Sequence, residues 1–166
     1  MCIRDRSQLI GEHTRIFLYG FGSSGLAAQE FQLRLLRLGM DAEAITELHQ
    51  MVLNEARITN ACLVIGISLS GATRELIDAL DRAKARGAAV IYLTSSNAER
   101  EKRTYEEIVL APVKKNLEYG NVISPQFPIL LILDLIYAQL LKEDRRSTEA
   151  QYDTHIWERI KDYHVG

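Results

Sequence analysis

The sequence predicts an α/β protein, a three-layer α/β/α sandwich built on a five-stranded parallel sheet. Short apolar runs alternate along the chain with longer segments in which apolar residues recur every three or four positions. The runs lack the regular in-and-out alternation of a half-exposed strand, and this is typical of parallel strands covered by helices on both faces. The 166 residues, 47% of them hydrophobic, are enough for one domain with a sizeable core.

The first half of the chain alternates strand and helix twice. The apolar run Ile16–Tyr19 is the first predicted strand. A helix is expected over Ser24–Leu38, because its apolar residues share one face, and Gly39 is a typical residue to end it. A short strand at Asp41–Ile45 and a helix at Leu48–Arg57 follow. Two such units in succession imply parallel pairing through right-handed crossovers.

The second half repeats this pattern from the centre of the sheet outward. The run Cys62–Ile67 is apolar throughout, which predicts the central strand. A helix over Thr73–Arg86 leads to another buried strand at Ala89–Thr94. The remaining predicted elements are a fifth strand at Ile108–Ala111, a buried helix at Pro128–Lys142 and a terminal amphipathic helix at Thr148–Tyr163.

The first six residues, MCIRDR, fit neither this pattern nor a recognisable helix start. We interpret residues 1–6 as a cloning or sequence-assembly scar and set them aside from the fold. The predicted domain therefore covers residues 7–166.

Composition and charge narrow the classes of function. The formal net charge is −2, so the chain has no basic excess to neutralise a nucleic-acid backbone, and we do not expect it to bind DNA by itself. The longest apolar stretch, Phe127–Leu141, is interrupted by Asp134 and Gln139 and is shorter than the roughly 20 residues of a membrane span. Two cysteines, Cys2 and Cys62, and no export signal predict a reducing, cytoplasmic location.

Two of the predicted strands are each followed by a polar loop that is rich in glycine and hydroxyl residues. The loop after the first strand reads GFGSSG, the loop after the central strand reads SLSGAT, and each leads into a predicted helix. In a parallel sheet such loops lie at the carboxyl ends of the strands, where free N–H groups and positive helix ends attract anions. We therefore predict a phosphate site. Its expected residues are Gly22, Ser23, Ser24, Ser68, Ser70, Gly71 and Thr73.

Two other interpretations of these loops stay open. Ser70 or Thr73 could serve only as a helix cap, although a cap needs one hydroxyl and this loop has three. The sequence GFGSSG also matches the G-x-G-x-x-G of dinucleotide-binding turns, with Glu47 as the acidic residue that such a site needs. The dinucleotide interpretation gives no role to the second loop.

The sequence indicates no further chemistry. The four histidines have no spacing typical of a metal site. There is no G-x-S-x-G motif, and neither Ser24 nor Ser70 has an evident base in the sequence. We accordingly predict no catalytic residue, no metal and no cofactor.

From about Thr14 onward the chain resembles the SIS, or sugar isomerase, phosphosugar-binding domains, which have a flavodoxin-like fold. The motifs GFGSSG, ISLSGATRE and VIYLTSS carry the resemblance. It implies that the partner of this domain is a phosphorylated sugar. The hydroxyls that would hold its phosphate are those of Ser24, Ser68, Ser70 and Thr73, with Ser23 as a helper.

Within that family, segment Asn121–Leu141 is most similar to the effector domain of RpiR/MurR-type bacterial transcription regulators. This likeness implies a phosphosugar sensor whose DNA contacts are made by an N-terminal helix-turn-helix domain, for which this sequence starts too late. Related SIS proteins also suggest a homodimer or homotetramer formed through the last two predicted helices.

The alternative is a stand-alone sugar-phosphate isomerase such as the 3-hexulose-6-phosphate isomerases. The resemblance places a catalytic glutamate of those enzymes approximately at Gln126, and an amide cannot take up a proton at neutral pH. Glu118 and Glu75 remain as substitutes for that base. The sequence therefore favours sensing without turnover and leaves the enzyme alternative open.

Overall fold

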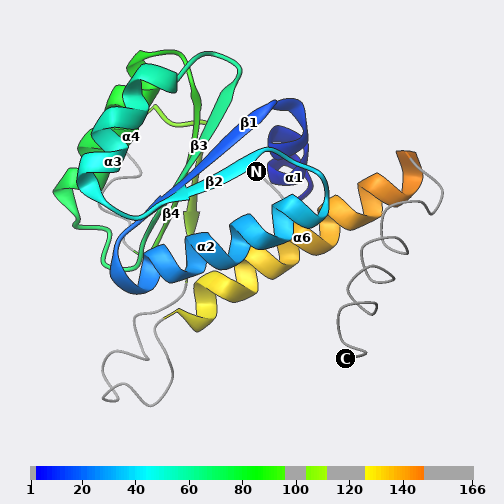
Figure 1. Ribbon diagram of the computed structural model, residues 1–166. Helices are drawn as coiled ribbons and strands as arrows, with labels where there is room; N and C mark the ends of the chain where they lie inside the picture. The colour runs from blue at the N-terminus through cyan, green and yellow to red at the C-terminus, as the bar shows by residue number, and fades with distance from the viewer. Residues whose placement is uncertain (1–2, 96–103, 112–125, 148–166) are drawn as a thin grey trace, which may run out of the picture.

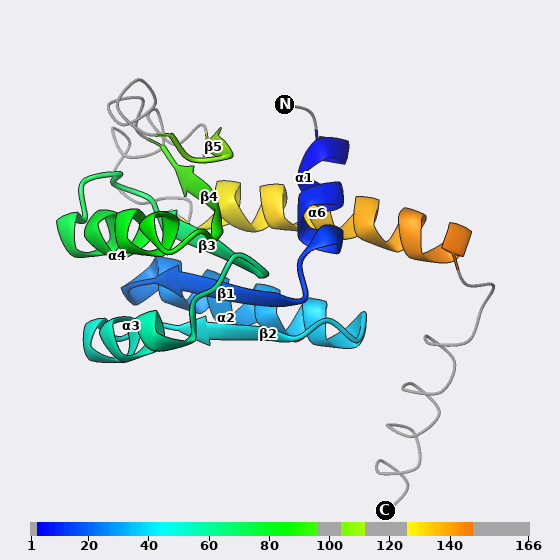
Figure 2. The same ribbon diagram turned by 90° about the horizontal axis from the view of Figure 1, so that it is seen from above.

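The sheet of the computed structural model has five parallel strands in the order β2-β1-β3-β4-β5, with helices on both faces (Figures 1 and 2). The structure describes residues 3–95, 104–111 and 126–147. The strands are β1 (Arg15–Gly20), β2 (Ala42–Ile45), β3 (Cys62–Ser68), β4 (Ala89–Thr94) and β5 (Glu107–Leu110). The helices are α1 (Ile3–Glu12), α2 (Gly22–Arg37), α3 (Leu48–Asn54), α4 (Arg74–Ala85) and α6 (Phe127–Ser147).

The order in which the chain adds strands to the sheet changes direction between β1 and β3. From β1 it moves outward to β2, returns past β1 to β3, and then continues the other way to β4 and β5. β1 and β3 are neighbours in register, from Arg15 beside Cys62 to Gly20 beside Ile67. Their carboxyl ends therefore flank the point of reversal, which is where open α/β sheets bind ligands.

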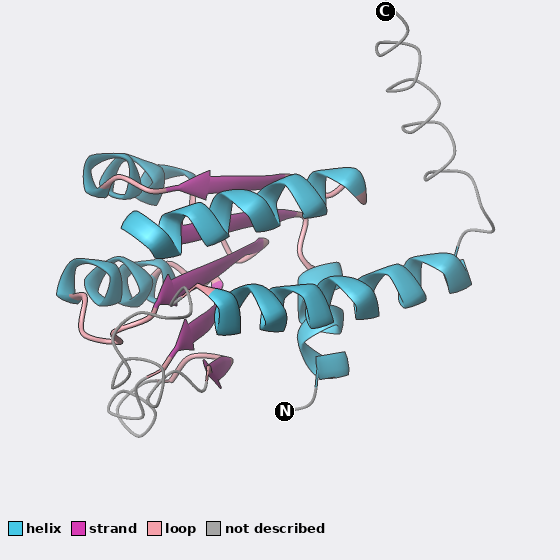
Figure 3. Cartoon of the chain, turned by 90° about the horizontal axis from the view of Figure 1, so that it is seen from below, coloured by secondary structure: helices cyan, strands magenta, loops and turns pink. Residues whose placement is uncertain are grey.

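Each face of the sheet has its own layer of helices. α1, α2 and α6 cover one face, and α3 and α4 cover the other (Figures 1 and 3). Successive residues of a strand pack into the cores on opposite faces of the sheet. Leu18 and Ile65 belong to the core under α1, α2 and α6, whereas Phe17 and Val64 belong to the core under α3 and α4. Because both sides of the strands are buried, the strands read as uninterrupted apolar runs.

The predicted architecture is confirmed, since all five strands, their parallel pairing and the helices on both faces are present. The helix predicted over Leu48–Arg57 is shorter than expected, because α3 ends at Asn54 and a single 3₁₀ turn, Glu55–Arg57, follows. The turn lets Ile58 leave in an extended conformation and enter the core. The predicted terminal helix, Thr148–Tyr163, lies outside the described residues.

Helix α1 is a correction to the sequence analysis, because it begins at Ile3 in the segment that was set aside. Distant contacts hold it: Arg6 donates to Glu107 of β5 at 2.8 Å, and the buried Ser7 hydroxyl donates to Glu143 of α6 at 3.1 Å. The partners are 101 and 136 residues away, so no local pattern could show them. That the first six residues are a scar stays a prediction.

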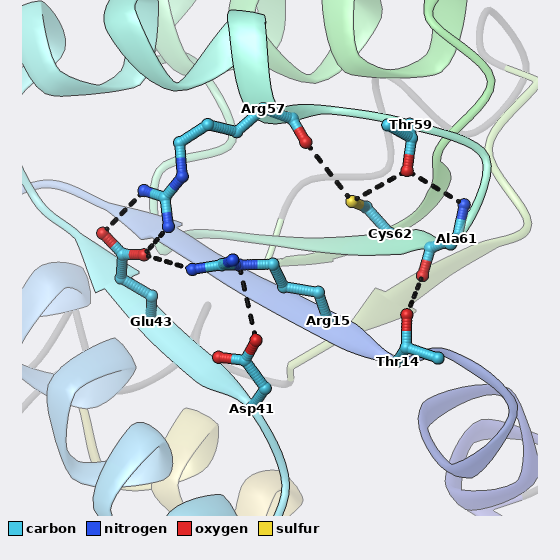
Figure 4. A network of polar contacts seen from close by, with 8 residues as sticks. All are labelled: Thr14, Arg15, Asp41, Glu43, Arg57, Thr59, Ala61 and Cys62. Carbon is cyan, nitrogen blue, oxygen red and sulfur yellow. Dashed lines mark hydrogen bonds and ion pairs between the residues drawn. The ribbon is translucent and has the colours of Figure 1, made fainter.

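A network of charged side chains lies at the β2 edge of the sheet (Figure 4). Glu43 accepts hydrogen bonds from Arg57 at 2.5 and 3.0 Å and from Arg15 at 3.4 Å. The guanidinium groups of Arg15 and Arg57 lie 5.3 and 5.1 Å from the ring centroid of Phe17. The hydrogen bond from Arg57 is the main cause that lowers the pKa of Glu43 below its ordinary value. The folded state therefore favours the charged carboxylate.

We expect this network to lose its stabilising effect in acid. A carboxyl group with a lowered folded-state pKa contributes stability above its unfolded pKa, about 4.3, and loses it as the pH falls through the folded pKa. The urea midpoint should therefore fall below about pH 5, and Glu43→Gln should reduce that fall while costing about 0.5–1 kcal/mol at neutral pH. Glu106, whose pKa is also lowered, should leave the variant with some acid sensitivity. Identical pH profiles for the two proteins would contradict this role.

Candidate functional site

The two polar loops lie side by side at the carboxyl edge of the sheet. One joins β1 to α2, the other joins β3 to α4, and the two strands are hydrogen-bonded neighbours. The loops also touch directly, because the N–H of Leu69 donates to Ser24 Oγ at 3.4 Å. Ser24 and Ser68 are buried, whereas Ser23 and Ser70 are exposed to solvent. The structure therefore brings together hydroxyls that are more than 40 residues apart, at the point of reversal.

Glycines make the first loop tight enough for α2 to start directly at the end of β1. Gly22 has φ of +51°, a conformation that other residues rarely adopt. A Cβ on Gly20 would lie 2.9 Å from the backbone carbonyl of Ser24, and a Cβ on Gly25 would lie 2.9 Å from the carbonyl oxygen of Gly20. The Gly-rich sequence thus holds Ser24, in the first turn of α2, against the end of the sheet.

Hydroxyls of the second loop gather around Ser68. Its Oγ lies 3.2 Å from Thr73 Oγ1 and 3.5 Å from Ser70 Oγ, and it accepts from the N–H of Gly71 at 3.2 Å. Gly71 has φ of +66° and turns the chain between the strand and the helix. Ser70 Oγ in turn accepts from the N–H of Ala72 at 3.3 Å. Three hydroxyls and several N–H groups therefore share one small region.

The geometry argues against a mere capping role for these hydroxyls. Thr73 occupies the N-cap position of α4, but its side chain makes no cap hydrogen bond and contacts Ser68 instead. α2 likewise begins at an N-cap residue, Phe21, without a side-chain cap. Two helix N-termini thus reach the same edge of the sheet without side-chain acceptors, and this arrangement suits an anion.

Ser95 contacts the second polar loop, and the sequence analysis did not assign it to the candidate site. It follows β4, and its hydroxyl donates to the carbonyl oxygen of Leu69. This bond ties the end of a third strand to the second polar loop. The sequence carried a signal for it, since Ser95 belongs to the motif VIYLTSS that formed part of the resemblance.

Three residues of the alternative interpretations lie at or next to helix starts. Glu47, the acidic residue of the dinucleotide interpretation, is exposed immediately before α3, so that interpretation gains no support. Glu75 is exposed in the first turn of α4, and Gln126 directly precedes α6, where its carbonyl oxygen accepts from Leu130. Glu118 lies outside the described residues.

The candidate site is rich in hydrogen-bond donors. Its serine and threonine hydroxyls, its loop N–H groups and the two helix N-termini are uncharged donors that suit phosphate oxygens. Within the described ranges, no group of three or more His, Cys, Asp and Glu residues could hold a metal ion. None of the helices in that part of the chain has the length and apolar character to cross a membrane.

Sequence comparison assigns this arrangement to a family. The profile of the SIS domain matches residues 8–130. The chain belongs to the SIS domain family. The matched part of this SIS domain includes all five strands and both polar loops.

Relatives of this SIS domain include transcription regulators. An uncharacterized HTH-type transcriptional regulator of Clostridium perfringens is 32% identical over 137 residues, which are 81% of this chain and 48% of the regulator. The SIS domain chain thus spans about half the length of that relative.

Solved structures share its fold. The Vibrio vulnificus NanR protein complexed with ManNAc-6P superposes with a TM-score of 0.79 at 22% identity, covering 99% of this chain and 61% of NanR. The sugar isomerase domain of an RpiR transcription factor from Sphaerobacter thermophilus gives a TM-score of 0.77 at 21% identity, covering 87% of this chain and 79% of that domain.

Proposed function

We propose that this SIS domain binds a phosphorylated sugar and acts as the sensing domain of an RpiR/MurR-type transcription regulator. The carrying observation is that Ser24 and the hydroxyls around Ser68 meet at the ends of β1 and β3, joined by the Leu69–Ser24 hydrogen bond. Neutral donors and two uncapped helix N-termini give this region the chemistry of a phosphate site.

Each predicted site residue has a role in this proposal. The buried Ser24 and Ser68 and the half-buried Thr73 hold phosphate oxygens, and the exposed Ser23 and Ser70 close over them from the solvent side. Gly22 and Gly71 provide the left-handed turns that present the loop N–H groups.

The relatives support the regulator assignment. An HTH-type regulator aligns with most of this chain, and a structure with the same fold holds ManNAc-6P. In the proposed regulator the DNA contacts are made by a helix-turn-helix domain rather than by this domain, whose sequence has a net charge of −2. A cytoplasmic location fits this role.

Calorimetric titration with hexose and pentose phosphates, each paired with its unphosphorylated sugar, tests the proposal. Binding is expected for at least one phosphorylated member and for no free sugar, because the donors of the two loops interact with the phosphate group. Equal affinity for glucose and glucose 6-phosphate, or no binding across the panel, would refute the phosphosugar site.

The second candidate function is aldose-ketose isomerisation, which proceeds through an enediol and needs a base beside the first sugar carbons. Gln126 precedes α6, approximately at the position where the resemblance places the catalytic glutamate of those isomerases. We therefore expect the bound sugar phosphate to be recovered unchanged from heavy water, with no deuterium next to its carbonyl. NMR of the recovered ligand measures both. Exchange that disappears in Glu75→Gln or Glu118→Gln would establish the isomerase instead.

Self-association as a homodimer or homotetramer is part of the same proposal. One of the two helices that predicted it, α6, is described by the structure and keeps Phe127, Leu131 and Leu135 exposed.

A further inference from the structure

Arg74 is the first residue of α4, the helix that follows the second polar loop. It comes directly after Thr73, whose hydroxyl lies 3.2 Å from Ser68 Oγ in the candidate site. Long side chains on a helix extend back toward its N-terminus, so this position gives the Arg74 guanidinium access to the edge of the sheet that carries the two loops. The side chain is exposed and is free to turn toward a ligand bound there.

Arg74 is the only arginine or lysine that the described part of the chain places at this edge. The other arginines and lysines of the described ranges lie in α1, at the first residue of β1, in the 3₁₀ turn after α3, in the later turns of α2, α4 and α6, or just after α4. Helices of a parallel α/β sheet run back from the carboxyl ends of the strands to the amino ends. These other cations therefore belong to the opposite edge of the sheet.

Within the described ranges, Arg74 has no acidic partner. Asp78 is one helical turn away, at a spacing where a pair can form, but the structure has no ion pair between the two side chains. Ion pairs occupy many of the other described cations, namely Arg6, Arg15, Arg34, Arg57, Arg82 and Lys84. The guanidinium of Arg74 is therefore able to pair with an anion from outside the chain.

The position of Arg74 is unfavourable for α4 itself. The start of a helix is the positive end of its dipole, which repels a cation and attracts an anion. Arg86, directly after the last residue of α4, has the favourable placement at the negative end. Arg74 thus gives no electrostatic support to its own helix, whereas a phosphate at the helix start would be attracted by the dipole and by the guanidinium together.

Acidic residues at the neighbouring helix starts increase the need for a cation. Glu75 in the first turn of α4 and Glu47 at the N-cap position of α3 are both exposed. Their charges repel a phosphate, and the hydroxyls and N–H groups of the two loops have no charge to offset this repulsion. Arginine supplies the missing charge and can donate two parallel hydrogen bonds to phosphate oxygens.

We propose that Arg74 binds the phosphate group at the candidate site and makes the site select esters with two negative charges over esters with one. The inference rests on the proposed phosphate site and adds the charge of the ligand class that this site accepts. A phosphate monoester has two negative charges above its second pKa, about 6, whereas a sulfate monoester of the same shape has one. The neutral donors of the loops can bind either group, so the preference between the two esters reports on the guanidinium.

NMR titration of the isotope-labelled chain with methyl phosphate and with methyl sulfate, at about pH 8 and constant ionic strength, tests the proposal. The amide signals of Gly71 and Ala72 report binding, and neither probe contains a sugar, so the result does not depend on which sugar the domain prefers. Wild type is expected to bind methyl phosphate about tenfold more tightly than methyl sulfate. Arg74→Gln should weaken methyl phosphate binding about tenfold and bring the two affinities within about threefold of each other. Arg74→Lys should keep part of the preference, because it keeps the charge but loses the paired hydrogen bonds.

Arg86→Gln is the matched control, because it removes another exposed arginine from the other end of the same helix. It should leave both affinities unchanged. Arg74→Gln should melt at or above the wild-type temperature, since it removes a cation from the positive end of α4, so weaker binding would not reflect unfolding. An unchanged preference in Arg74→Gln, or an equal loss of it in Arg86→Gln, would overturn the role of Arg74 while leaving the phosphate site in place. A wild type whose loop signals respond to neither probe would refute the phosphate site itself, and this inference with it.

Discussion

Replacing Ser68 by alanine is expected to weaken sugar-phosphate binding about 10- to 100-fold. A hydrogen bond to a charged group contributes about 1.5–3 kcal/mol, and Ser68→Ala removes one such bond. It also removes the acceptor of the Gly71 N–H and the hydroxyl that contacts Thr73 and Ser70. The loop that presents the other donors is therefore expected to lose its shape, and calorimetry with the best ligand of the panel measures the combined effect.

Two further variants serve as the comparison and the control for Ser68→Ala. Ser70→Ala should weaken binding by roughly tenfold, because Ser70 is exposed and its loss leaves the contact between Ser68 and Thr73 in place. Thr59→Ala should leave affinity unchanged, since Thr59 lies at the opposite end of β3, beside Cys62 (Figure 4). Wild-type affinity in a folded Ser68→Ala protein would remove the second loop from the site.

Replacing Gly66 by valine is expected to destabilise the fold by about 2–3 kcal/mol, which lowers the melting temperature by roughly 5–10 °C. A Cβ on Gly66 would lie only 2.4 Å from Leu80 Cδ1 and 3.1 Å from Leu80 Cγ, so the buried Leu80 side chain would have to shift to admit any larger residue. Valine at this position pushes Leu80, and with it α4, away from the sheet. Thermal unfolding followed by circular dichroism measures the loss.

The chain offers a matched control and a second-site test for this variant. Gly11→Ala should be tolerated, because a Cβ at Gly11 meets nothing within 4 Å. Leu80→Ala combined with Gly66→Val should cost less than the sum of the two single variants, since Leu80→Ala vacates the space that the valine side chain needs. A double variant whose loss is the plain sum of the two single losses would show that the contact with Leu80 is not the cause.

Sequence patterns were sufficient for the sheet because its strands are buried on both faces. β1 and β3 read as apolar runs, and the polar loops after them could be placed at one edge as soon as the strands were taken to be parallel. Gly22 and Gly71 were among the predicted site residues, and the structure gives both the left-handed conformation that glycine adopts without strain.

Contacts between distant segments could not be predicted in this way. Helix α1 makes hydrogen bonds to Glu107 and Glu143, and neither residue forms a pattern with Arg6 or Ser7 in the sequence. The bond from Ser95 to the second loop needs β4 beside β3 at a particular register. Threonine is a typical N-cap residue, so the sequence suggests that the Thr73 hydroxyl caps α4. In the structure this hydroxyl contacts Ser68 Oγ instead, and the sequence alone does not show that the two lie so close.

The uncapped starts of α2 and α4 give the proposed ligand a part in forming secondary structure. A helix start is complete when acceptors satisfy its first N–H groups, and neither Phe21 nor Thr73 supplies a side-chain acceptor. A bound phosphate would supply them to both helices at once. The first turns of α2 and α4 should then fray when the sugar phosphate is scarce and exchange their amide hydrogens more slowly when it is abundant. The concentration of the sugar phosphate would thus determine how well ordered the first turns of α2 and α4 are.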